Sequence, residues 1–582
     1  MAEYNISLFF WQGSFRVFCP SGRLLAVACS EVFGDGTLDG EVFYARLRAS
    51  SEKESVSLYT DTHYAGEQAY RLFPALPQTT HLTICDLRLT APDLQLTIAT
   101  LAGVVNRGPQ RLYFIESDDD IFWLSELGAS LPRTRLALAG DDLLAHLLTE
   151  YRDHLTGLIL YDPALPDTRN VASVLAALDD GLAVSPTQAQ QLQNDPYRLP
   201  VLADLRIHAW KSSVQVYRWA YDHLLPRCSA NLLAGLDPTI SARLRSFLVT
   251  HRIFTCWLDT RRIARLSSPG WLSGRGLFRH ILARFAPGSL YLGWFPDEPS
   301  GIRLTSRAAL LTLASDHCTN LTVWSNLPER VQENDPAFSG SPAPSLEESA
   351  GVGREAKKVY LSFTFSDGDN LQYCQHRLLR LWQDPARGSL PLGWTISPAL
   401  GQAMPALAAF YRRTATANDE FIAGPSGAAY LLPSCLPEAQ RIAFLQRTAK
   451  YMQAMQLTLL QILDSNTRFS MKWLHPGLQK LFIAQLAPYG LRGVFSGAGS
   501  ISPSWHRRAG LPIYQNLGLA MTARRTLQLI RCAAARGQRF INVYVFAWRI
   551  SPGDLLGIVK QLDSTFCLVT PGRLLELIEQ EG

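Results

Sequence analysis

Residues 359–370 have the sequence Val-Tyr-Leu-Ser-Phe-Thr-Phe-Ser-Asp-Gly-Asp-Asn, and this stretch decides the fold class. Its first seven residues are mainly aliphatic and aromatic, which predicts a buried strand over 359–365. Two carboxylates and an amide follow at once, around a glycine that permits a sharp turn. A buried strand that ends in polar residues is typical of parallel α/β sheets and barrels, whose functional groups lie on the loops after the strands.

The same pattern continues to the end of the chain. Amphipathic stretches separate most of the predicted strands, which lie at 359–365, 391–396, 421–423, 457–463, 493–495, 512–514, 541–546 and 566–569. Seven or eight strand and helix units within about 220 residues predict a barrel-like domain over 358–582. The predicted fold class is therefore α/β, with a carboxy-terminal (β/α)7–8 barrel-like domain.

Three further segments precede the predicted barrel. Residues 328–357 are rich in Glu, Pro, Ser and Gly and form a predicted linker. Residues 79–327 alternate short apolar strands with amphipathic stretches, which predicts one or two α/β domains. Residues 1–78 contain short strand-like runs separated by glycine-containing turns, which predicts a small β-rich segment.

The composition limits the classes of partner. A net charge of +5 over 582 residues, without a block of Lys and Arg, argues against nucleic acid as a partner. No apolar run approaches the ~18 residues of a spanning helix, so membrane insertion is not expected. The amino-terminal residues lack the pattern of a signal peptide, which favours a cytoplasmic location. The ten cysteines form no Cys-x-x-Cys pair and are expected to be free thiols in a reducing compartment.

Carboxylates at the ends of two predicted strands are the candidate catalytic groups. Glycoside hydrolysis needs one carboxylic acid to protonate the leaving oxygen and a second carboxylate as nucleophile or base. We predict Asp367 and Asp464 in these two roles, in either order. Asp369 and Asn370, which follow the same strand as Asp367, are expected to orient the substrate or an attacking water.

Hydroxyl and aromatic side chains near other strand ends are the candidate binding groups. Sugars are held by hydrogen bonds and by aromatic faces. Ser426 and Tyr430 follow the third predicted strand and are expected to donate hydrogen bonds to a sugar. Trp394, in the second strand, or Trp548, after the seventh, is expected to offer an aromatic face.

Each of these carboxylates also has a structural alternative. Residues 366–370 are compatible with a tight turn in which Asp369 or Asn370 caps the next helix. Asp464 is equally compatible with an Asx turn. Asp297 and Glu298 follow a predicted strand of the α/β region, and we expect them to lie in a solvated turn.

A different chemistry is also compatible with the first strand. Residues 363–368, Phe-Thr-Phe-Ser-Asp-Gly, resemble the strand-end motif Thr-Phe-Asp-Asp-Gly of polysaccharide deacetylases, whose aspartates serve a divalent metal and a base. Such a site also needs a pair of histidines, and those downstream are isolated. The glycine-rich phosphate-binding motifs are absent as well. We therefore predict no metal and no cofactor.

Four motifs occur in order along the predicted barrel, at 366–373, 382–388, 391–398 and 427–433. Together they resemble the bacterial GxGYxYP family of glycoside hydrolases, and the likeness extends forward to about His81. The resemblance implies amino-terminal α/β domains, a carboxy-terminal barrel-like domain that bears the signature, and hydrolysis of a carbohydrate. It also sets the predicted cytoplasmic location against relatives that resemble exported proteins.

The signature itself is incomplete in this chain. Gly427, Tyr430 and Pro433 match it, whereas Ala429 replaces its second glycine and Leu432 replaces its second tyrosine. If that tyrosine contacts a sugar in the family, the contact is weaker or different here, because leucine has no hydroxyl.

These observations predict a glycoside hydrolase-like enzyme with a carbohydrate substrate. Two alternatives stay open: a carbohydrate-binding or scaffold protein without catalysis, and a metal-dependent enzyme like the polysaccharide deacetylases. A catalytic pair of carboxylates lies ~5–10 Å apart across one pocket, whereas a binding protein has no such requirement. The sugar, its linkage and the oligomeric state do not follow from the sequence.

Overall fold

The computed structural model describes residues 71–127, 131–261, 273–327, 358–464, 474–500 and 503–581, together with six strands between residues 3 and 59. The chain divides into two compact units, Met1–Arg71 and Leu72–Gly582. The predicted linker at 328–357 lies outside the described residues. No helix in the described part is long and apolar enough to cross a membrane.

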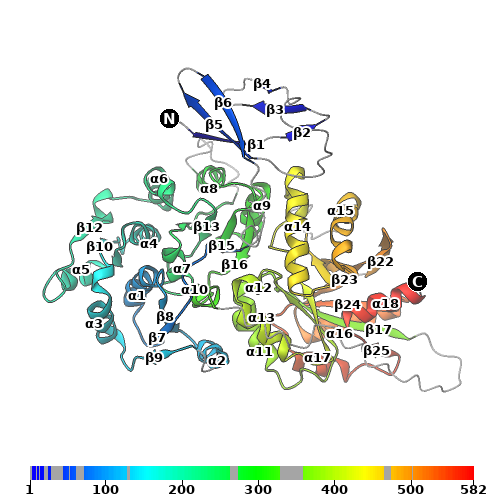
Figure 1. Ribbon diagram of the computed structural model, residues 1–582. Coiled ribbons are helices and arrows are strands. Elements are labelled where there is room, and N and C mark those ends of the chain that lie inside the picture. Colours follow the sequence, from blue (N-terminus) through cyan, green and yellow to red (C-terminus); the bar gives the residue numbers. More distant parts are fainter. Residues whose placement is uncertain are drawn as a thin grey trace. The chain divides into compact units, whose positions relative to one another are not determined.

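The described part of the amino-terminal unit consists of six strands, which pair antiparallel in two sheets (Figure 1). One sheet has the strand order β1-β5-β6 and the other β2-β3-β4. The strands are β1 (Glu3–Ser7), β2 (Phe9–Trp11), β3 (Ser14–Phe18), β4 (Leu24–Val27), β5 (Tyr44–Ser50) and β6 (Lys53–Tyr59). This antiparallel pairing contrasts with the parallel sheets of the second unit.

The α/β region before the barrel contains three small parallel sheets, with the orders β8-β7-β9, β11-β10-β12 and β14-β13-β15-β16 (Figure 1). The strands are β7 (His81–Asp86), β8 (Gln110–Ile115), β9 (Arg133–Arg135), β10 (Leu158–Leu160), β11 (Leu182–Val184), β12 (Val201–Asp204), β13 (Leu232–Gly235), β14 (Phe254–Cys256), β15 (Leu290–Gly293) and β16 (Leu311–Ala314). The helices are α1 (Pro92–Val105), α2 (Asp118–Glu126), α3 (Gly140–Tyr151), α4 (Asp167–Asp179), α5 (Pro186–Leu192), α6 (Ser213–His223), α7 (Arg245–Thr250), α8 (Gly274–Leu282), α9 (Glu298–Arg307) and α10 (Leu321–Trp324).

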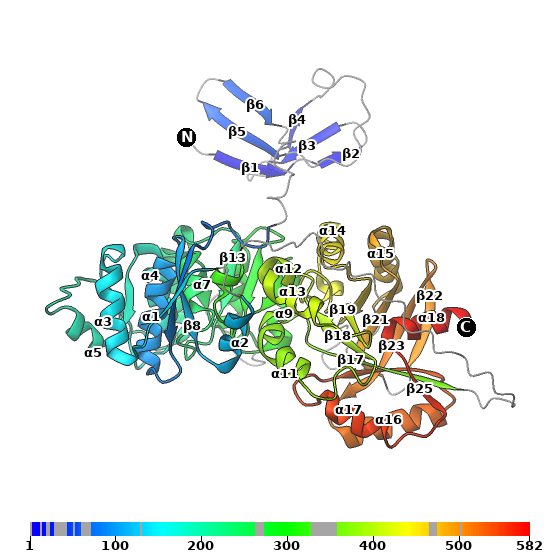
Figure 2. The ribbon, with the colours of Figure 1, turned by 60° about the horizontal axis from the view of Figure 1, so that its bottom comes forward.

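Seven parallel strands close into the predicted barrel (Figure 2). The ring runs β17-β18-β19-β20-β21-β23-β24 and closes because β17 pairs with both β24 and β18. The ring strands are β17 (Val359–Phe365), β18 (Leu392–Ile396), β19 (Asp419–Ala423), β20 (Leu459–Ile462), β21 (Gly493–Ser500), β23 (Leu511–Ala520) and β24 (Phe540–Val545). Two further strands, β22 (Ser504–Arg508) and β25 (Phe566–Leu568), pair with β23 and β17.

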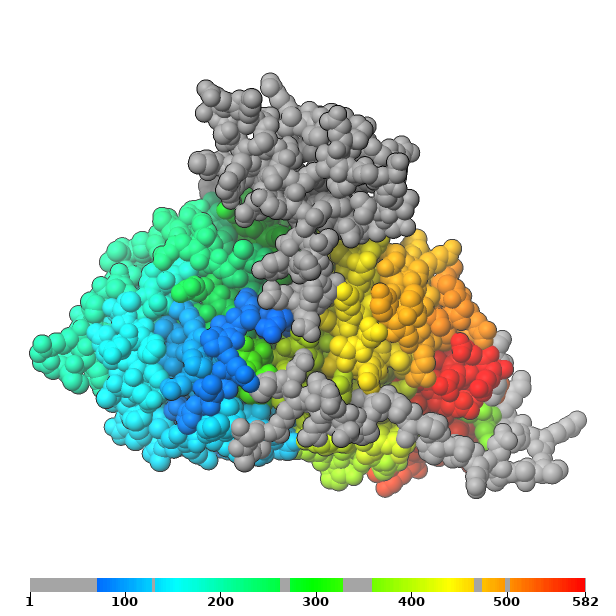
Figure 3. Space-filling model, viewed as in Figure 1, coloured from blue at the N-terminus to red at the C-terminus, as the bar shows by residue number. Residues whose placement is uncertain are grey.

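The helices around the barrel follow its strands in the expected alternation. They are α11 (Leu378–Trp382), α12 (Leu400–Ala403), α13 (Pro405–Arg413), α14 (Glu438–Ala454), α15 (Pro476–Leu486), α16 (Ala523–Ala535), α17 (Pro552–Val559) and α18 (Pro571–Glu581). The barrel and the α/β region share one hydrophobic core, which includes Ile84 and Leu292 from two small sheets and Phe363 from β17. In the space-filling view the two parts form one continuous body (Figure 3).

Helix α18 closes the amino-terminal end of the barrel. Leu575 and Ile578 of this helix pack with Phe495 of β21 in one buried cluster. The backbone N–H of Gly572 donates a hydrogen bond to the carboxylate of Glu420, near the start of β19 (2.6 Å). The half of the barrel interior at the amino-terminal ends of the strands is therefore apolar and filled with side chains.

Beyond this apolar cluster, toward the carboxyl ends of the strands, the barrel interior is polar. Asn542 Oδ1 accepts hydrogen bonds from the hydroxyls of Ser362 (2.7 Å) and Thr364 (3.1 Å). Asn542 Nδ2 donates to Asn516 (2.8 Å), whose Nδ2 donates to Gln461 (2.9 Å). All five side chains are fully buried. Because these side chains form hydrogen bonds with one another, polar groups can be buried inside the barrel, below the loops that follow the strands, at little cost in stability.

The contact between β21 and α18 gives a test of this closure. A Cβ added at Gly493 would lie 2.4 Å from Leu575 Cδ1, so Gly493→Ala is expected to lower the melting temperature. Leu575→Ala is expected to lower it too, because a leucine-to-alanine cavity costs about 2–5 kcal/mol. In the double variant the new methyl group occupies part of the new cavity, so thermal unfolding should show a smaller loss than the sum of the two. Additive losses would mean that the two residues do not share this space.

Candidate active site

The loop after β17 carries Asp367 and Asp369, and two neighbouring strands hold it in place. The hydroxyl of Ser366 donates a hydrogen bond to the Asp367 carboxylate. The Thr395 hydroxyl of β18 accepts one from the N–H of Gly368 (2.9 Å). Glycine is required at this position because a Cβ would lie 2.1 Å from the carbonyl carbon of Thr395. Both aspartates therefore lie at the carboxyl end of the barrel, where the sequence predicts them.

The two aspartates differ in their surroundings. Burial raises the pKa of Asp367, whereas hydrogen bonds from Ser366 and from the Trp548 side chain lower it. Asp369 is only 8 % exposed, and its pKa is raised well above the ordinary value by burial and then by the charges of Asp367 and Glu298. The site therefore favours a protonated Asp369 beside an Asp367 that has donors for its carboxylate form.

A third carboxyl group, that of Glu298, comes from the α/β region. Glu298 begins α9, shortly after the carboxyl end of β15, and its Oε1 accepts a hydrogen bond from the Tyr430 hydroxyl (3.0 Å). Loss of water around its carboxyl group raises the pKa of Glu298. The hydrogen bond from Tyr430 lowers this pKa, and the charges of Asp367 and Asp297 raise it further. The charge of Asp367 thus affects carboxyl groups in both parts of the chain, those of Asp369 and Glu298.

Tyr430 links the barrel to the third small sheet. Its backbone N–H donates to the carbonyl of Thr312 in β16 (2.9 Å), which forms an isolated antiparallel bridge. Its ring stacks on Trp294, with ring centroids 6.1 Å apart and an interplanar angle of 13°. Leu432 is buried in the core of the α/β region, and its N–H donates to Ser306 Oγ (3.0 Å). Tyr430 thus connects the two parts beside Glu298, and the side chain of Leu432 packs in the core.

Two buried tyrosines near Asp367 have no hydrogen-bond partner for their hydroxyls among the residues that the structure describes. They are Tyr373, which precedes α11, and Tyr544 at the end of β24. Burial raises the pKa of both hydroxyls, and the charge of Asp367 contributes to each shift. Trp548 is 42 % exposed and packs edge-on against Tyr373, with ring centroids 5.9 Å apart. An unpaired buried hydroxyl is costly, which is typical of a group that waits for a ligand.

Two of the predicted binding residues have structural roles. Asn370 Oδ1 accepts a hydrogen bond from the N–H of Tyr373 (3.0 Å), as a helix cap does. Ser426 is fully buried, and its Oγ donates to the carbonyl of Leu463 (2.9 Å) and accepts from the N–H of the same residue (3.2 Å). Ser426 therefore joins the loops after β19 and β20 and does not face an open pocket.

Trp394 is not a candidate for sugar stacking, which corrects the prediction for this residue. Its side chain is fully buried, stacks on Phe365 with ring centroids 4.6 Å apart, and donates a hydrogen bond to Asp419 (2.8 Å). Neighbouring residues along a strand face opposite sides, and Thr395, next in the strand, is the one that supports the loop after β17. Both faces of the Trp394 ring are used in the core.

Asp464 lies at the end of β20, three strands from β17 around the ring. It is 2 % exposed, and its Oδ1 accepts hydrogen bonds from the hydroxyl (2.8 Å) and the N–H (3.2 Å) of Ser434. This is the geometry expected of a carboxylate that fastens a turn. The charge of Asp367 contributes to the raised pKa of Glu298, so Glu298 is a carboxyl group from another part of the chain that interacts with Asp367.

The sequence analysis missed Glu298, Trp294, Tyr373 and Tyr544 as site residues. Glu298 is exposed, as expected of a solvated position, but it begins a helix and its carboxyl group also accepts a hydrogen bond from Tyr430 of the barrel. The rule that found Asp367, that functional groups follow strands, also applies to the end of β15. Among the described residues, no group of three or more His, Cys, Asp or Glu side chains is arranged to hold a metal ion.

Family models match most of the chain after the amino-terminal unit. The "GxGYxYP putative glycoside hydrolase C-terminal domain" matches residues 357–579. Models described as the first, second and third domains of the GxGYxYP amino-terminal region match residues 81–153, 155–228 and 230–326. These three segments coincide with the three small sheets. No curated protein matches the sequence.

A solved structure, the "putative hydrolase from Bacteroides thetaiotaomicron VPI-5482", has the same fold. The similarity covers 87 % of this chain and 95 % of that chain, with a TM-score of 0.70 and 20 % identity. A "putative polysaccharide deacetylase from Mycobacterium smegmatis" matches 40 % of this chain and 93 % of its own, with 12 % identity and a TM-score of only 0.29. The first similarity establishes the architecture of the α/β region and barrel together.

Proposed function

The chain belongs to the GxGYxYP family, and from this premise we propose that it is a glycoside hydrolase whose active site lies between the barrel mouth and α9. The descriptions of the family and of the Bacteroides structure both support a hydrolase. The observation that carries the proposal is the group formed by Asp367, Asp369 and Glu298. Tyr430 donates a hydrogen bond to Glu298, and the charge of Asp367 contributes to the raised pKa of both Asp369 and Glu298.

The surroundings of the carboxyl groups support different roles. Asp367 accepts hydrogen bonds from Ser366 and Trp548, which stabilise its charged form as a nucleophile or base. Glu298 has a raised pKa and one oxygen held by Tyr430, which supports its role as the acid that protonates the leaving oxygen. Burial and the charges of Asp367 and Glu298 raise the pKa of Asp369, which favours a protonated Asp369 beside the other two carboxyl groups.

Aromatic and hydroxyl groups around these carboxyl groups supply the binding chemistry for a sugar. The stacked pair Trp294 and Tyr430 adjoins Glu298, and the exposed Trp548 adjoins Asp367. Tyr430 supplies a hydroxyl at Glu298, whereas the hydroxyls of Tyr373 and Tyr544 are fully buried and would reach a carbohydrate only if neighbouring side chains move. A flat apolar face together with hydroxyl partners is the combination that sugar rings require.

The test is a screen of the full chain against glycans and aryl glycosides, with release of reducing sugar or aglycone as the readout. Hydrolysis supports the proposal if it is lost in Asp367→Asn. Retention of a glycan without bond cleavage would indicate the carbohydrate-binding alternative. Release of acetate from acetylated glycans, without cleavage of the sugar chain, would indicate the deacetylase alternative and overturn the proposal.

Asp464→Asn provides the matched comparison, because it changes a strand-end aspartate of the same barrel. Asparagine keeps the Oδ1 that accepts hydrogen bonds from Ser434, so the turn should persist. We expect kcat/KM within about threefold of the wild type, since a group away from the chemistry contributes little to transition-state binding. A loss as large as that of Asp367→Asn would restore Asp464 as the catalytic partner.

A further inference from the structure

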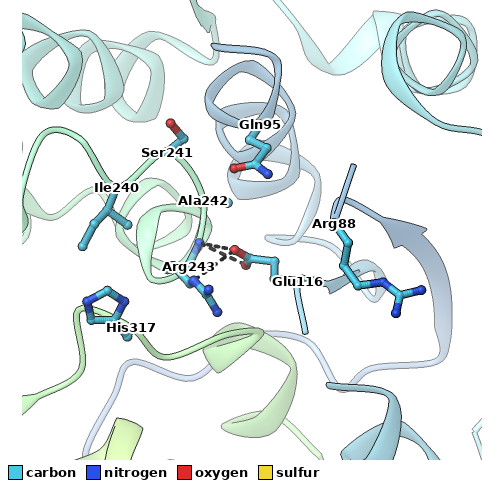
Figure 4. A pocket seen from close by; sticks show the side chains of 8 residues that line it. All are labelled: Arg88, Gln95, Glu116, Ile240, Ser241, Ala242, Arg243 and His317. Atoms are coloured by element: carbon cyan, nitrogen blue, oxygen red, sulfur yellow. Dashed lines mark hydrogen bonds and ion pairs between the residues drawn. The ribbon is translucent and has the colours of Figure 1, made fainter. Parts of the chain in front are cut away.

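A cavity of about 200 Å³ lies in the α/β region (Figure 4). This volume is several times the ~30 Å³ share of one water molecule. The wall is mostly polar, and it consists of Arg88, Gln95, Glu116, Ile240, Ser241, Ala242, Arg243 and His317. None of these residues belongs to the candidate active site, so the cavity is a separate feature of the fold.

The cavity lies at the carboxyl ends of strands from two of the small sheets. Arg88 follows β7 and Glu116 follows β8 in the first sheet. Residues 240–243 follow β13, and His317 follows β16, in the third sheet. In the first sheet the chain passes from β7 to β8 and then crosses to β9 on the other side of β7. Open parallel sheets bind ligands at the carboxyl ends of their strands, beside such a reversal.

Arg243 is held at the centre of the wall by Glu116. The backbone N–H of Arg243 donates to both carboxylate oxygens of Glu116 (3.1 and 3.3 Å), and its Nε lies 3.3 Å from Oε2. Its backbone has a φ of 56°, which is unusual for a residue other than glycine. The terminal nitrogens Nη1 and Nη2 have no partner in the described part of the chain. The guanidinium is therefore positioned, and two of its nitrogens are available to a ligand.

The neighbouring side chains add hydrogen-bonding groups and little further charge. Among the described residues, none forms a hydrogen bond with the hydroxyl of Ser241 or with the side-chain carbonyl of Gln95, whose amide donates to the carbonyl of Leu87 (3.0 Å). The guanidinium of Arg88, by contrast, is bound to Asp86 (2.7 Å) and Asp118 (2.9 Å). Within the described residues the cavity thus offers one available guanidinium, one hydroxyl donor and one amide acceptor.

We propose that this cavity binds a small hydroxylated oxyanion, with Arg243 on the anionic group and Ser241 and Gln95 on the hydroxyls. A carboxylate or a phosphate matches the fork of the guanidinium. The hydroxyl and the amide oxygen match the hydroxyls of a sugar acid or a sugar phosphate. The proposal concerns a second site and does not depend on the chemistry of the barrel.

The charge of Glu116 makes this binding depend on pH. Burial raises the pKa of Glu116 to about 7, against the effect of Arg243 and with a contribution from Asp120. Arg88 and His317 are the other charged or titratable groups that line the same cavity. An ionised Glu116 repels an anion, so affinity should be higher at pH 6, where Glu116 is mostly neutral, than at pH 8.

The experiment measures the thermal shift of the full chain with glucuronate, glucose 6-phosphate, inorganic phosphate and glucose at equal concentration and low salt. We expect a rise of several degrees with at least one anionic probe, a larger rise at pH 6 than at pH 8, and none with glucose. Arg243→Gln should abolish the rise. Arg279→Gln is the control, because Arg279 is an exposed residue of α8 outside the cavity.

A second variant covers the case in which Arg243→Gln fails to fold. Ser241→Ala leaves the contacts between Arg243 and Glu116 intact and should weaken binding of the anionic sugar at least threefold in calorimetry. A response to inorganic phosphate alone that disappears in Arg243→Gln supports the site with phosphate as the bound group. The proposal is overturned if no anionic probe stabilises the protein, if glucose does so equally well, or if neither cavity variant changes the response.

Discussion

Asp367→Asn is expected to lower kcat/KM for glycoside hydrolysis by about a thousandfold, within the range of 10²–10⁴ that a positioned acid or base contributes. Asparagine has the same size as aspartate but can be neither the nucleophile nor the base. Ser366 and Thr395 should still hold the loop, because their hydrogen bonds to the backbone of neighbouring residues remain. The measurement is steady-state hydrolysis of the best substrate from the screen.

The melting temperature of Asp367→Asn should stay at or above that of the wild type. The raised pKa of Asp367 means that the folded protein disfavours its charged form. The contribution of Asp367 to the free energy of unfolding therefore decreases as the pH rises from the ordinary carboxyl pKa through the raised pKa of Asp367. Removing the charge removes this cost at neutral pH. Activity within tenfold of the wild type would exclude Asp367 from the chemistry, whereas inactivity with a collapsed melting transition would indicate a structural role.

Glu298→Gln is expected to lower kcat about a hundredfold or more on substrates with poor leaving groups, and much less on aryl glycosides with acidic leaving groups. A good leaving group departs without a proton, so only poor ones need the general acid. The wild-type rate should fall as the pH rises through the raised pKa of Glu298, because the acid must be protonated. In Glu298→Gln this decline should disappear, while the acidic limb set by Asp367 remains.

Asp297→Asn is the control for this prediction. Asp297 precedes Glu298, and its Oδ2 accepts a hydrogen bond from the N–H of Ser300 (3.1 Å) at the start of α9. Its replacement should weaken the helix cap, at a cost of roughly 1 kcal/mol or less. The decline of the rate with rising pH should remain, moved to lower pH because the charge of Asp297 contributes to the raised pKa of Glu298. If Glu298→Gln affects good and poor leaving groups equally, Glu298 positions the substrate through Tyr430 and is not the proton donor.

Local patterns in the sequence were sufficient to predict the barrel and part of its site. The apolar runs and the helical periodicity are properties of short segments, so they predict β17 to β24 and the helices between them. Functional groups of parallel barrels lie on the loops that follow the strands, and on this basis Asp367, Asp369, Tyr430 and Trp548 were expected in such loops. The structure has them there. The family resemblance came from the same loops and is confirmed over residues 81–326 and 357–579.

The direction of a side chain was not predictable from these patterns alone. Trp394 lies in a strand that the sequence predicts, yet it stacks on Phe365 in the core. Whether a strand residue faces the barrel interior, the surrounding helices or the mouth depends on its register with its neighbours, and a shift of one residue reverses it. Ser426 likewise lies in a predicted loop, but packing between that loop and Leu463 buries its hydroxyl.

The sequence by itself determined the fold class, the strand-end carboxylates of β17 and the family, because each depends on residues that are close together in the chain. Only the tertiary structure indicates Glu298 as the second carboxylate that we propose beside Asp367. Glu298 and Tyr430 are 132 positions apart, and packing of the third small sheet against the barrel brings their side chains within 3.0 Å. Contacts of that kind are set by burial of a shared core, which no local pattern encodes.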